Sequence, residues 1–215
     1  MMDTDDNEIE EFLIKNVTPE NLVASANLLY NPLLQLVPDF QLFKSMDKNL
    51  LFRIECFKSD DMSDLDKNSC FEIIEKNMKK MYKISNWGWS ANKKKKELFN
   101  SLSRFIVCRT VDGSRQIKAF VHFRFETDYN DPVLYCYEIQ LCSDVRKCGL
   151  GSFLMEAQLA LAKKTSMLKL MLTVFKHNET GLRFFKKFGF EIDPTDPSKN
   201  GVFDVDYIIM SIFLD

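Results

Sequence analysis

Short hydrophobic segments, alternating or continuous, recur along the C-terminal two-thirds of the chain and are separated by turn residues. They predict strands at residues 104–110, 117–125, 133–141, 168–175 and 207–213. Helical patterns lie between the later strands, at residues 150–164 and 178–187. The predicted order of elements in this part of the chain is therefore β-β-β-α-β-α-β.

The first third of the chain has a less regular pattern. Thr18-Pro19-Glu20 is typical of a helix start, and residues 50–57 and 69–83 predict a strand and an amphipathic helix. The fold class expected from the whole pattern is α/β (α+β), a central mixed twisted sheet with helices on both faces. We expect this domain to span residues 46–215, after an acidic tail and N-terminal helical extension at residues 1–45.

A predicted parallel crossover joins residues 133–141 to residues 168–175 through the helix at 150–164. Ligand sites of such units open at the carboxyl ends of the strands, near a helix N-terminus. The segment VRKCGLG, residues 145–151, lies at this point. Its glycines would let the backbone approach a phosphate, and the free N–H groups of the helix favour negative charge. Taken alone, the pattern is equally consistent with a structural turn.

Composition narrows the classes of function. The 29 basic and 31 acidic residues give a net charge of −2, which does not indicate a nucleic-acid binder. The acidic N-terminus argues against a secretory or transit peptide, and no apolar run is long enough for a membrane span. Six cysteines without a C-x-x-C pair, and only two histidines, argue against a structural zinc site. We therefore expect no metal and a reducing, intracellular compartment.

The order of motifs resembles a known family. Ile139-Gln140-Leu141 followed by R-K-C-G-L-G (residues 146–151), a helix and a strand resembles the GCN5-related N-acetyltransferases, whose C-terminal signature resembles FFKKFGFEI here. The strings MYKISNWGW, HFRFE, LYCYEIQL, MLTVFKHN and FEIDPTDPS resemble the N-terminal acetyltransferase D family of histone N-alpha-acetyltransferases, from about residue 45 almost to the C-terminus. The resemblance implies acetyl transfer from acetyl-CoA to the N-terminal amine of histones 4 and 2A, whose mature N-termini share Ser-Gly-Arg-Gly.

The resemblance also implies roles for individual residues. Glu138 is the candidate general base, with Tyr137 beside it as the second catalytic candidate; the alternative for Glu138 is a solvated strand face. The expected cofactor-binding residues are Ile139, Gln140, Leu141, Arg146, Lys147, Cys148, Gly149, Leu150, Gly151, Ser152, Thr173 and Asn178. The expected acceptor-binding residues are Tyr82, Trp87, Glu126, Tyr135, Tyr137, Thr195 and Tyr207.

Several of these residues have a plainer interpretation. Asn178 is also a typical helix N-cap, and the loop that holds Thr195 can serve only as a connection. Of Trp87 and Trp89 we assign one to the substrate and the other to packing. Lys93–Lys96 is expected to be a solvated helix face rather than a contact to DNA or to acidic partners. His122 is interpreted as a core residue and receives no catalytic role.

Two departures from the family pattern stand out, and two other functions stay open. The chain begins acidic where the family can carry a lysine-rich tail, and Glu126 stands where the family has aspartate. The same fold can acetylate lysine side chains or small amines, and a non-catalytic acyl-CoA-binding or chromatin module is the third hypothesis. For the leading hypothesis we expect histone tails as partners, a monomer without membrane or direct nucleic-acid binding, and a cytoplasmic and nuclear location.

Overall fold

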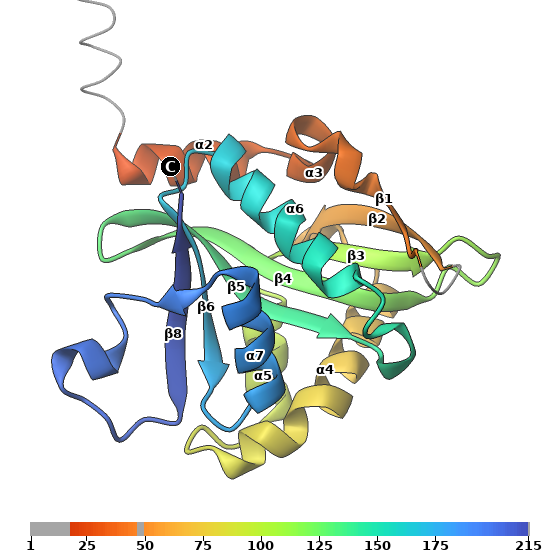
Figure 1. The fold of residues 1–215 in the computed structure, drawn as a ribbon. Coiled ribbons are helices and arrows are strands. Elements are labelled where there is room, and N and C mark those ends of the chain that lie inside the picture. The colour runs from red at the N-terminus through yellow and green to blue at the C-terminus, as the bar shows by residue number, and fades with distance from the viewer. Residues whose placement is uncertain (1–17, 47–49, 215) are drawn as a thin grey trace, which may run out of the picture.

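One eight-stranded sheet forms the centre of the computed structural model, which describes residues 18–46 and 50–214 (Figure 1). The strand order is β1-β2-β3-β4-β5-β6-β8-β7. The strands are β1 (Leu42–Lys44), β2 (Leu51–Lys58), β3 (Arg104–Thr110), β4 (Ile117–Asp128), β5 (Asp131–Leu141), β6 (Lys169–Phe175), β7 (Glu191–Ile192) and β8 (Tyr207–Phe213). The α-helices are α2 (Pro19–Leu28), α3 (Pro32–Leu36), α4 (Asp64–Ile84), α5 (Ala91–Leu98), α6 (Leu150–Lys164) and α7 (Glu179–Phe188). Short 3-10 helices lie at η1 (Pro38–Gln41), η2 (Ser59–Asp61), η3 (Ser143–Val145) and η4 (Pro197–Asn200).

The sheet is mixed, as the sequence predicts. Strands β1 to β5 pair antiparallel in succession, β5 pairs parallel with β6 across α6, and β8 pairs antiparallel with β6 and β7. The predicted strands at 104–110 and 207–213 have the predicted bounds. The hairpin of β4 and β5 is longer than predicted, because Tyr129 (φ 47°) and Asn130 (φ 69°) form a tight two-residue connection with both residues at positive φ.

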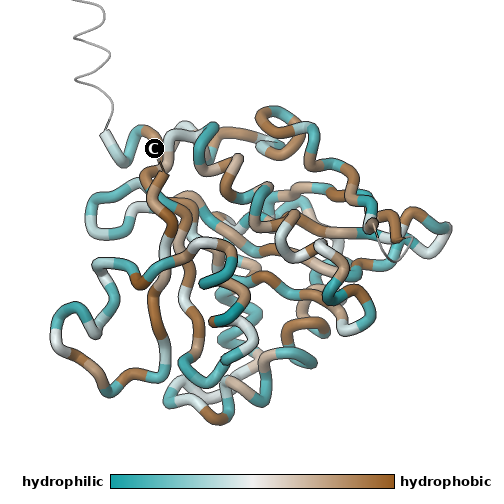
Figure 2. Tube along the Cα trace, in the orientation of Figure 1, coloured by the Kyte–Doolittle hydropathy of each residue, from teal (hydrophilic) through white to brown (hydrophobic). Residues whose placement is uncertain are grey.

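Helices cover both faces of the sheet and enclose two apolar cores. In Figure 1, α6 and α7 lie in front of the sheet and α4 and α5 lie behind it. The larger core joins α6 to the front-facing side chains of the strands, and the smaller one joins α4 and α5 to Phe105, Val107 and Phe120. Figure 2 shows that hydrophobic residues are concentrated in the central strands. No helix within the described ranges is both long and apolar enough to cross a membrane.

The N-terminal extension packs against the sheet domain. Ala26, Leu33 and Val37 are buried in the larger core together with β4 and α6. The buried guanidinium of Arg104 on β3 donates hydrogen bonds to the carbonyls of Asn27 (2.9 Å) and Leu29 (2.7 Å) at the end of α2. The predicted acidic tail falls in residues 1–17, outside the described residues, and the predicted boundary after residue 45 stays a prediction.

Candidate active site

The parallel pairing of β5 and β6 ends part-way along both strands. The register runs from Val133↔Lys169 to Cys136↔Leu172. Beyond it, within the described residues, β5 continues in register with β4 alone as far as Leu141, and β6 with β8 alone. The backbone groups of residues 137–140 that face away from β4 are therefore free to bind a ligand. This is the position at which the crossover pattern predicts a ligand site.

A β-bulge lies at the same point of β5. His122 pairs with Glu138, but the next pair is Phe123 with Cys136, so Tyr137 is an extra residue on β5. Such an insertion interrupts the alternation of side chains between the two faces of a sheet. Tyr137 contacts Glu126, and Glu138 contacts Lys94 of α5, whereas Cys136 faces α6. The bulge thus brings both catalytic candidates to the face that α4 and α5 cover.

Glu138 is buried, with 5% of its surface exposed, and forms an ion pair. Its Oε1 atom lies 2.5 Å from Nζ of Lys94, and its Oε2 atom accepts a hydrogen bond from Nε2 of Gln140 (2.7 Å). The alternative interpretation of Glu138 as a residue on a solvated strand face is therefore wrong. A carboxylate at this depth needs the partners that it has.

The burial of Lys94 contradicts part of the prediction that Lys93–Lys96 form a solvated helix face. Lys93, Lys95 and Lys96 are exposed as expected, but Lys94 is 5% exposed and lies against the sheet. It precedes the buried Leu98 by four residues and so shares its helix face. This spacing was the signal in the sequence that could have identified Lys94. Burial alone would lower the pKa of Lys94, but Glu138, Tyr82 and Glu97 outweigh it, and its pKa is raised.

Tyr135 and Tyr137 form the wall next to Glu138. Their ring centroids lie 4.7 Å apart. The Tyr137 hydroxyl donates to Oε1 of Glu126 (2.8 Å), and the Tyr135 hydroxyl lies 2.5 Å from Oγ1 of Thr173 on β6. Tyr135, Tyr137, Glu126 and Thr173, all predicted site residues, therefore lie together beside the point where β5 and β6 part.

Burial shifts the pKa values of these side chains. It raises the pKa of Tyr135 to about 12 and raises that of Tyr137, with the Glu126 carboxylate adding to the second shift. Burial also raises the pKa of Glu126, although the Tyr137 hydrogen bond and Arg124 oppose it. Both phenols therefore keep their protons at neutral pH and can act as hydrogen-bond donors.

An aromatic wall closes the other side of the site. The ring of Trp87 lies 5.2 Å from those of Phe175 and Tyr207, and Tyr82 lies 5.0 Å from Phe175. Trp87 is 52% exposed, whereas Trp89 packs on Tyr82 and joins the core under α4. Trp89 therefore packs, as the sequence interpretation assigns it, and the exposed Trp87 stays the tryptophan predicted for the substrate.

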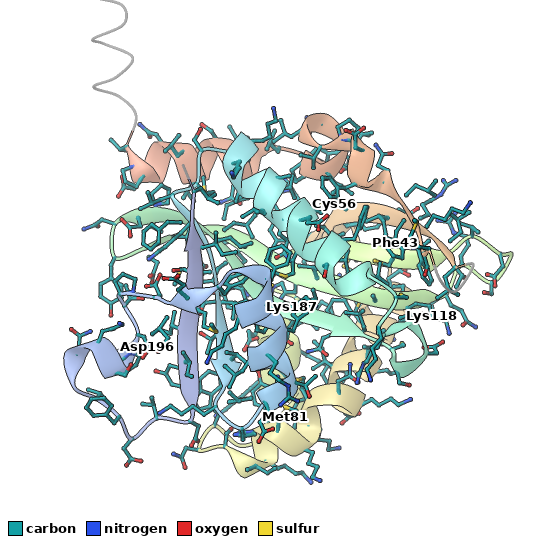
Figure 3. All side chains as sticks on the ribbon, in the orientation of Figure 1. Phe43, Cys56, Met81, Lys118, Lys187 and Asp196 are labelled. Carbon is teal, nitrogen blue, oxygen red and sulfur yellow. The ribbon has the colours of Figure 1, made fainter. Side chains whose placement is uncertain are left out.

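The end of α4 is attached to the end of β6, which holds this wall in place. His177, just after β6, donates from Nε2 to the carbonyl of Met81 (3.1 Å), which Figure 3 labels at the end of α4. The His177 ring also stacks on Phe175, with centroids 5.1 Å apart. Segments almost 100 residues apart in the sequence therefore meet at the site.

Thr195 is not shown to join these walls. Its backbone N–H (2.8 Å) and hydroxyl (2.6 Å) both donate to Oδ1 of Asp193, and Asp193 is ion-paired with the buried Lys169. These bonds fold the loop that connects β7 to β8. They favour the plainer interpretation of Thr195 as part of a connection.

The glycine-rich loop ends at the first turn of α6. Gly149 is the N-cap of α6 with φ of 88°, a left-handed conformation that glycine adopts without strain, and it offers no side chain to cap the helix. Leu150 is buried, Gly151 is partly buried, and Ser152 is exposed. Phe43, labelled in Figure 3, lies beside this cap, 3.8 Å from where a Cβ on Gly149 would be. The N–H groups of this turn fit an anionic ligand.

The segment before the cap is fixed to β5 and α4. The Arg146 guanidinium donates to the Leu141 carbonyl (3.0 Å) and to Oδ1 of Asn77 (2.8 Å), and Asn77 donates in turn to Oε1 of Gln140 (2.9 Å). Cys148 is buried, with its thiol 3.0 Å from the Val145 carbonyl. Lys147 is exposed. The loop is therefore attached through Gln140 to the Glu138 carboxylate.

Ile139, Leu141 and Asn178 border the same region. Ile139 and Leu141 are partly buried against the core under α6. Asn178 is the N-cap of α7 and accepts the Gly181 N–H (3.0 Å), so its interpretation as a helix cap is confirmed. A Cβ on Gly181 would lie only 2.6 Å from Nδ2 of Asn178, so glycine leaves room for this cap.

Sequence reasoning missed three further neighbours of the site. They are Lys94, Arg124, whose guanidinium carbon lies 4.5 Å from the centroid of the Tyr137 ring, and Phe175. Arg124 precedes Glu126 by two residues on β4 and so shares its face, a period-2 signal that the sequence does contain. His122 is buried, with Nε2 2.9 Å from Oγ of Ser103, and burial keeps its pKa well below the usual value.

Comparison with known proteins agrees with this geometry. Residues 68–190, more than half of the chain, match the acetyltransferase (GNAT) family. Similar solved structures include the PaiA N-acetyltransferase of Thermoplasma acidophilum in complex with coenzyme A (18% identity, 75% of this chain and 99% of that chain, TM-score 0.51) and Ard1 of Thermoplasma volcanium (20%, 75% and 98%, 0.52). NAA60 of Arabidopsis thaliana in complex with a bisubstrate analogue is 12% identical over 75% of this chain and 98% of that chain, with a TM-score of 0.54.

These structural similarities support the fold, and the family match supports the class of reaction. Among the residues that the structure describes, no group of three or more histidine, cysteine, aspartate or glutamate side chains is arranged to hold a metal ion. The chain belongs to the GNAT family of acetyltransferases, which use acetyl-CoA as the acetyl donor.

Proposed function

We propose that this acetyltransferase modifies the N-terminal α-amine of proteins that begin Ser-Gly-Arg-Gly, as histones 4 and 2A do. The observation that carries the proposal is the bulge at Tyr137, which brings Glu138 and Tyr137 to one face of β5. Tyr137 bonds Glu126 there, and Lys94, the partner of Glu138, bonds Tyr82 of the aromatic wall. The family strings in the sequence support the same acceptor.

The cofactor would lie along the unpaired part of β5 and end at α6. The N–H groups of Gly149, Leu150 and Gly151 would hold the pyrophosphate, since a helix N-terminus without a side-chain cap favours an anion. Backbone groups of residues 139–141 and the side chain of Thr173 would line the pantetheine arm. Bound there, acetyl-CoA supplies an activated thioester. The residues of this chain supply its orientation and accept the proton of the acceptor.

Glu138 is the proposed base. As the amine nitrogen forms the new amide bond, the carbon–sulfur bond of the thioester would break and coenzyme A would leave as a thiolate that takes up a proton. The amine nitrogen loses a proton in the same reaction, which Glu138 accepts directly or through one water molecule. A free α-amine has a pKa of about 8, so at neutral pH a weak base is sufficient; a lysine amine, at about 10.4, needs much more help. The Lys94 ammonium near Glu138 further disfavours the binding of a second cation at this place. These charges support an α-amine acceptor over a lysine side chain.

The walls of the site suit the rest of the proposed acceptor. Glu126 offers a carboxylate to the arginine at the third position, and the Trp87 and Tyr207 rings offer close, flat contacts to glycine. A histone acceptor would also imply an enzyme of the cytoplasm and nucleus.

Two synthetic peptides test the proposal. One begins with free Ser-Gly-Arg-Gly-Lys, and the other has the same sequence with a blocked N-terminus. We expect acetylation of the free peptide at its first residue, located by tandem mass spectrometry, and almost none of the blocked one. Equal acetylation of both on lysine would contradict the N-terminal assignment. Binding of acetyl-CoA without turnover of either peptide would instead favour a non-catalytic module.

A further inference from the structure

The ammonium of Lys94 joins the proposed base to the aromatic wall. Its Nζ atom lies 2.5 Å from Oε1 of Glu138, 2.6 Å from Oε1 of Glu97 and 2.7 Å from the Tyr82 hydroxyl. An ammonium has three N–H donors. Each of them therefore has an acceptor, and these acceptors come from β5, α5 and α4.

The other oxygen of Glu138 is held from the opposite side. Gln140 donates to Oε2 of Glu138, and Asn77 of α4 fixes Gln140. The carboxylate therefore has a cation on one oxygen and an amide on the other, and its orientation is determined by both. Only the cation also contacts the acceptor wall, through Tyr82.

The titratable and charged groups that face the Glu138–Lys94 pair come from every element packed against it. They are Glu97 on α5, Tyr82 on α4, and His122 and Arg124 on β4. His122 is neutral because burial and the positive charges of Arg124 and Lys94 lower its pKa, and Tyr82 is neutral because burial raises its pKa. The side chain of Glu97 is 40% exposed, so solvent screens part of its charge, and the rest partly neutralises Lys94. Arg124 and Glu126 are only partly buried, so the fully buried charges next to the acceptor site are those of Glu138 and Lys94.

We propose that Lys94 is a positioning residue for acetyl transfer, whose ammonium keeps the Glu138 carboxylate ionised and oriented and favours entry of the acceptor amine in its neutral form. The proposal rests on the proposed function, because it takes Glu138 as the base. Lys94 also attaches α5 to the sheet. An attachment alone would affect folding and would leave the pH dependence of turnover unchanged.

The test is the pH–rate profile of kcat, which reports groups of the bound complex, for three variants with the free Ser-Gly-Arg-Gly-Lys peptide at saturating concentration. In Lys94→Met the acid limb should move to higher pH by about one unit, since an opposite charge at this distance has that effect on a carboxylate. Lys94→Arg keeps the charge and should keep the limb near its wild-type position. Lys96→Met, an exposed lysine of the same helix, is the matched control and should change nothing.

A further variant covers the case in which Lys94→Met does not fold. Glu97→Gln leaves both members of the buried pair in place and removes a carboxylate that partly neutralises Lys94. The acid limb should then move to lower pH, opposite to the shift in Lys94→Met. The proposal would be overturned if the acid limb did not move in Lys94→Met or moved equally in Lys94→Arg. It would also be overturned if the acid limb in Glu97→Gln stayed in place or moved to higher pH.

Failure of this proposal is distinguishable from failure of the proposed function. The free and blocked peptides decide which amine the wild-type enzyme acetylates, and the same pH profiles can be recorded with whichever amine reacts. A readout that needs no acceptor is the titration of the Glu138 side-chain carboxyl, followed by carbon-13 NMR in the full chain. It should move to higher pH in Lys94→Met; an unchanged titration would overturn the role of Lys94 whatever the acceptor is.

Discussion

At the scale of single residues, the proposed function depends on a buried carboxylate whose neighbours differ from those of an ordinary surface glutamate. Glu138 lies between an ammonium and an amide, at a depth where an unpaired charge would be costly. The type and position of this residue were recognisable in the sequence, because an acid inside the apolar strand LYCYEIQL is unusual. Its partner Lys94 was not recognised, since a run of four lysines favours a solvated face.

Replacing the proposed base should reduce turnover far more than cofactor binding. We expect Glu138→Gln to lower kcat by roughly 10²- to 10⁴-fold, the usual contribution of a general base. Lys94 keeps Glu97 as a charged partner, so folding should persist. Initial rates with the free peptide, and coenzyme A affinity by calorimetry, check this, with the exposed Glu72→Gln on α4 as control. Wild-type kcat in Glu138→Gln would exclude Glu138 as the base.

Glu126 should make stability depend on pH with a definite sign. Burial raises the pKa of Glu126 in the folded protein above its pKa in the unfolded chain. Protonated Glu126 therefore stabilises the fold fully at pH values below the unfolded-state pKa, and this stabilisation is lost as the pH rises through the folded-state pKa. Glu126→Gln should therefore raise Tm at pH 7, with little difference below about pH 4. Thermal melts across this range, with exposed Glu156→Gln as control, measure it. A gain in Tm that is the same at every pH would contradict this explanation.

The substitution Glu126→Gln should also weaken binding of the acceptor peptide. Loss of a charge-assisted hydrogen bond to the third-position arginine should raise KM for the Ser-Gly-Arg-Gly peptide by about tenfold or more, with KM for acetyl-CoA unchanged. An equal rise for a peptide with alanine at the third position would show that Glu126 does not bind that arginine.

At the scale of elements, the site is made where regular structure is interrupted. The bulge in β5, the end of the β5–β6 pairing and the uncapped start of α6 lie within one stretch of chain, residues 136–151. Each interruption leaves backbone groups or side chains available that a continuous strand or a capped helix would use up. Of these, the glycine-rich start of α6 was visible in the sequence, whereas the bulge was not.

Gly149 offers a test of the loop with a matched control. It has φ of 88°, and Gly201 in a distant loop has φ of 78°; neither would crowd an added Cβ. Alanine at either position should cost about 1 kcal/mol of unfolding free energy, the usual cost of the left-handed region. Only Gly149→Ala should also raise KM for acetyl-CoA. Urea unfolding and steady-state kinetics measure both quantities, and equal KM values would argue against a role of this cap in cofactor binding.

At the scale of the whole molecule, the N-terminal extension and the sheet domain share one core. The GNAT family match begins at residue 68, but α2 and α3 are attached to β3 and α6 by Arg104 and by buried apolar residues. The extension lies over the larger core, opposite the face that carries Glu138. Its contribution is therefore to the stability of the sheet that holds the site.

Arg104→Met should reveal this contribution. The substitution leaves the partly buried carbonyls of Asn27 and Leu29 without their charged donor, so we expect a loss of about 2–4 kcal/mol in unfolding free energy. Chemical unfolding of the full chain measures it, with the exposed Arg183→Met as control. Similar values for the two variants would mean that Arg104 does not anchor α2.

Much of the fold and part of the site were predictable from local patterns. The order of strands and helices, the parallel crossover and the glycine loop follow from periodicity, turn residues and helix caps, because these act over a few neighbouring residues. They were enough to predict a ligand site at the start of α6 and to single out Glu138 as an acid inside an apolar strand. The roles of Tyr137 and of the aromatic residues on the acceptor side come from the family resemblance and stay predictions.

Only the tertiary structure decided how these parts meet. The bulge that turns Tyr137 and Glu138 to one face depends on pairing with β4, and the burial of Lys94 depends on how α5 packs on the sheet. Register, bulges and buried ion pairs are set by contacts between distant segments. The local sequence therefore determined which groups the site contains, and long-range packing determined which of them touch.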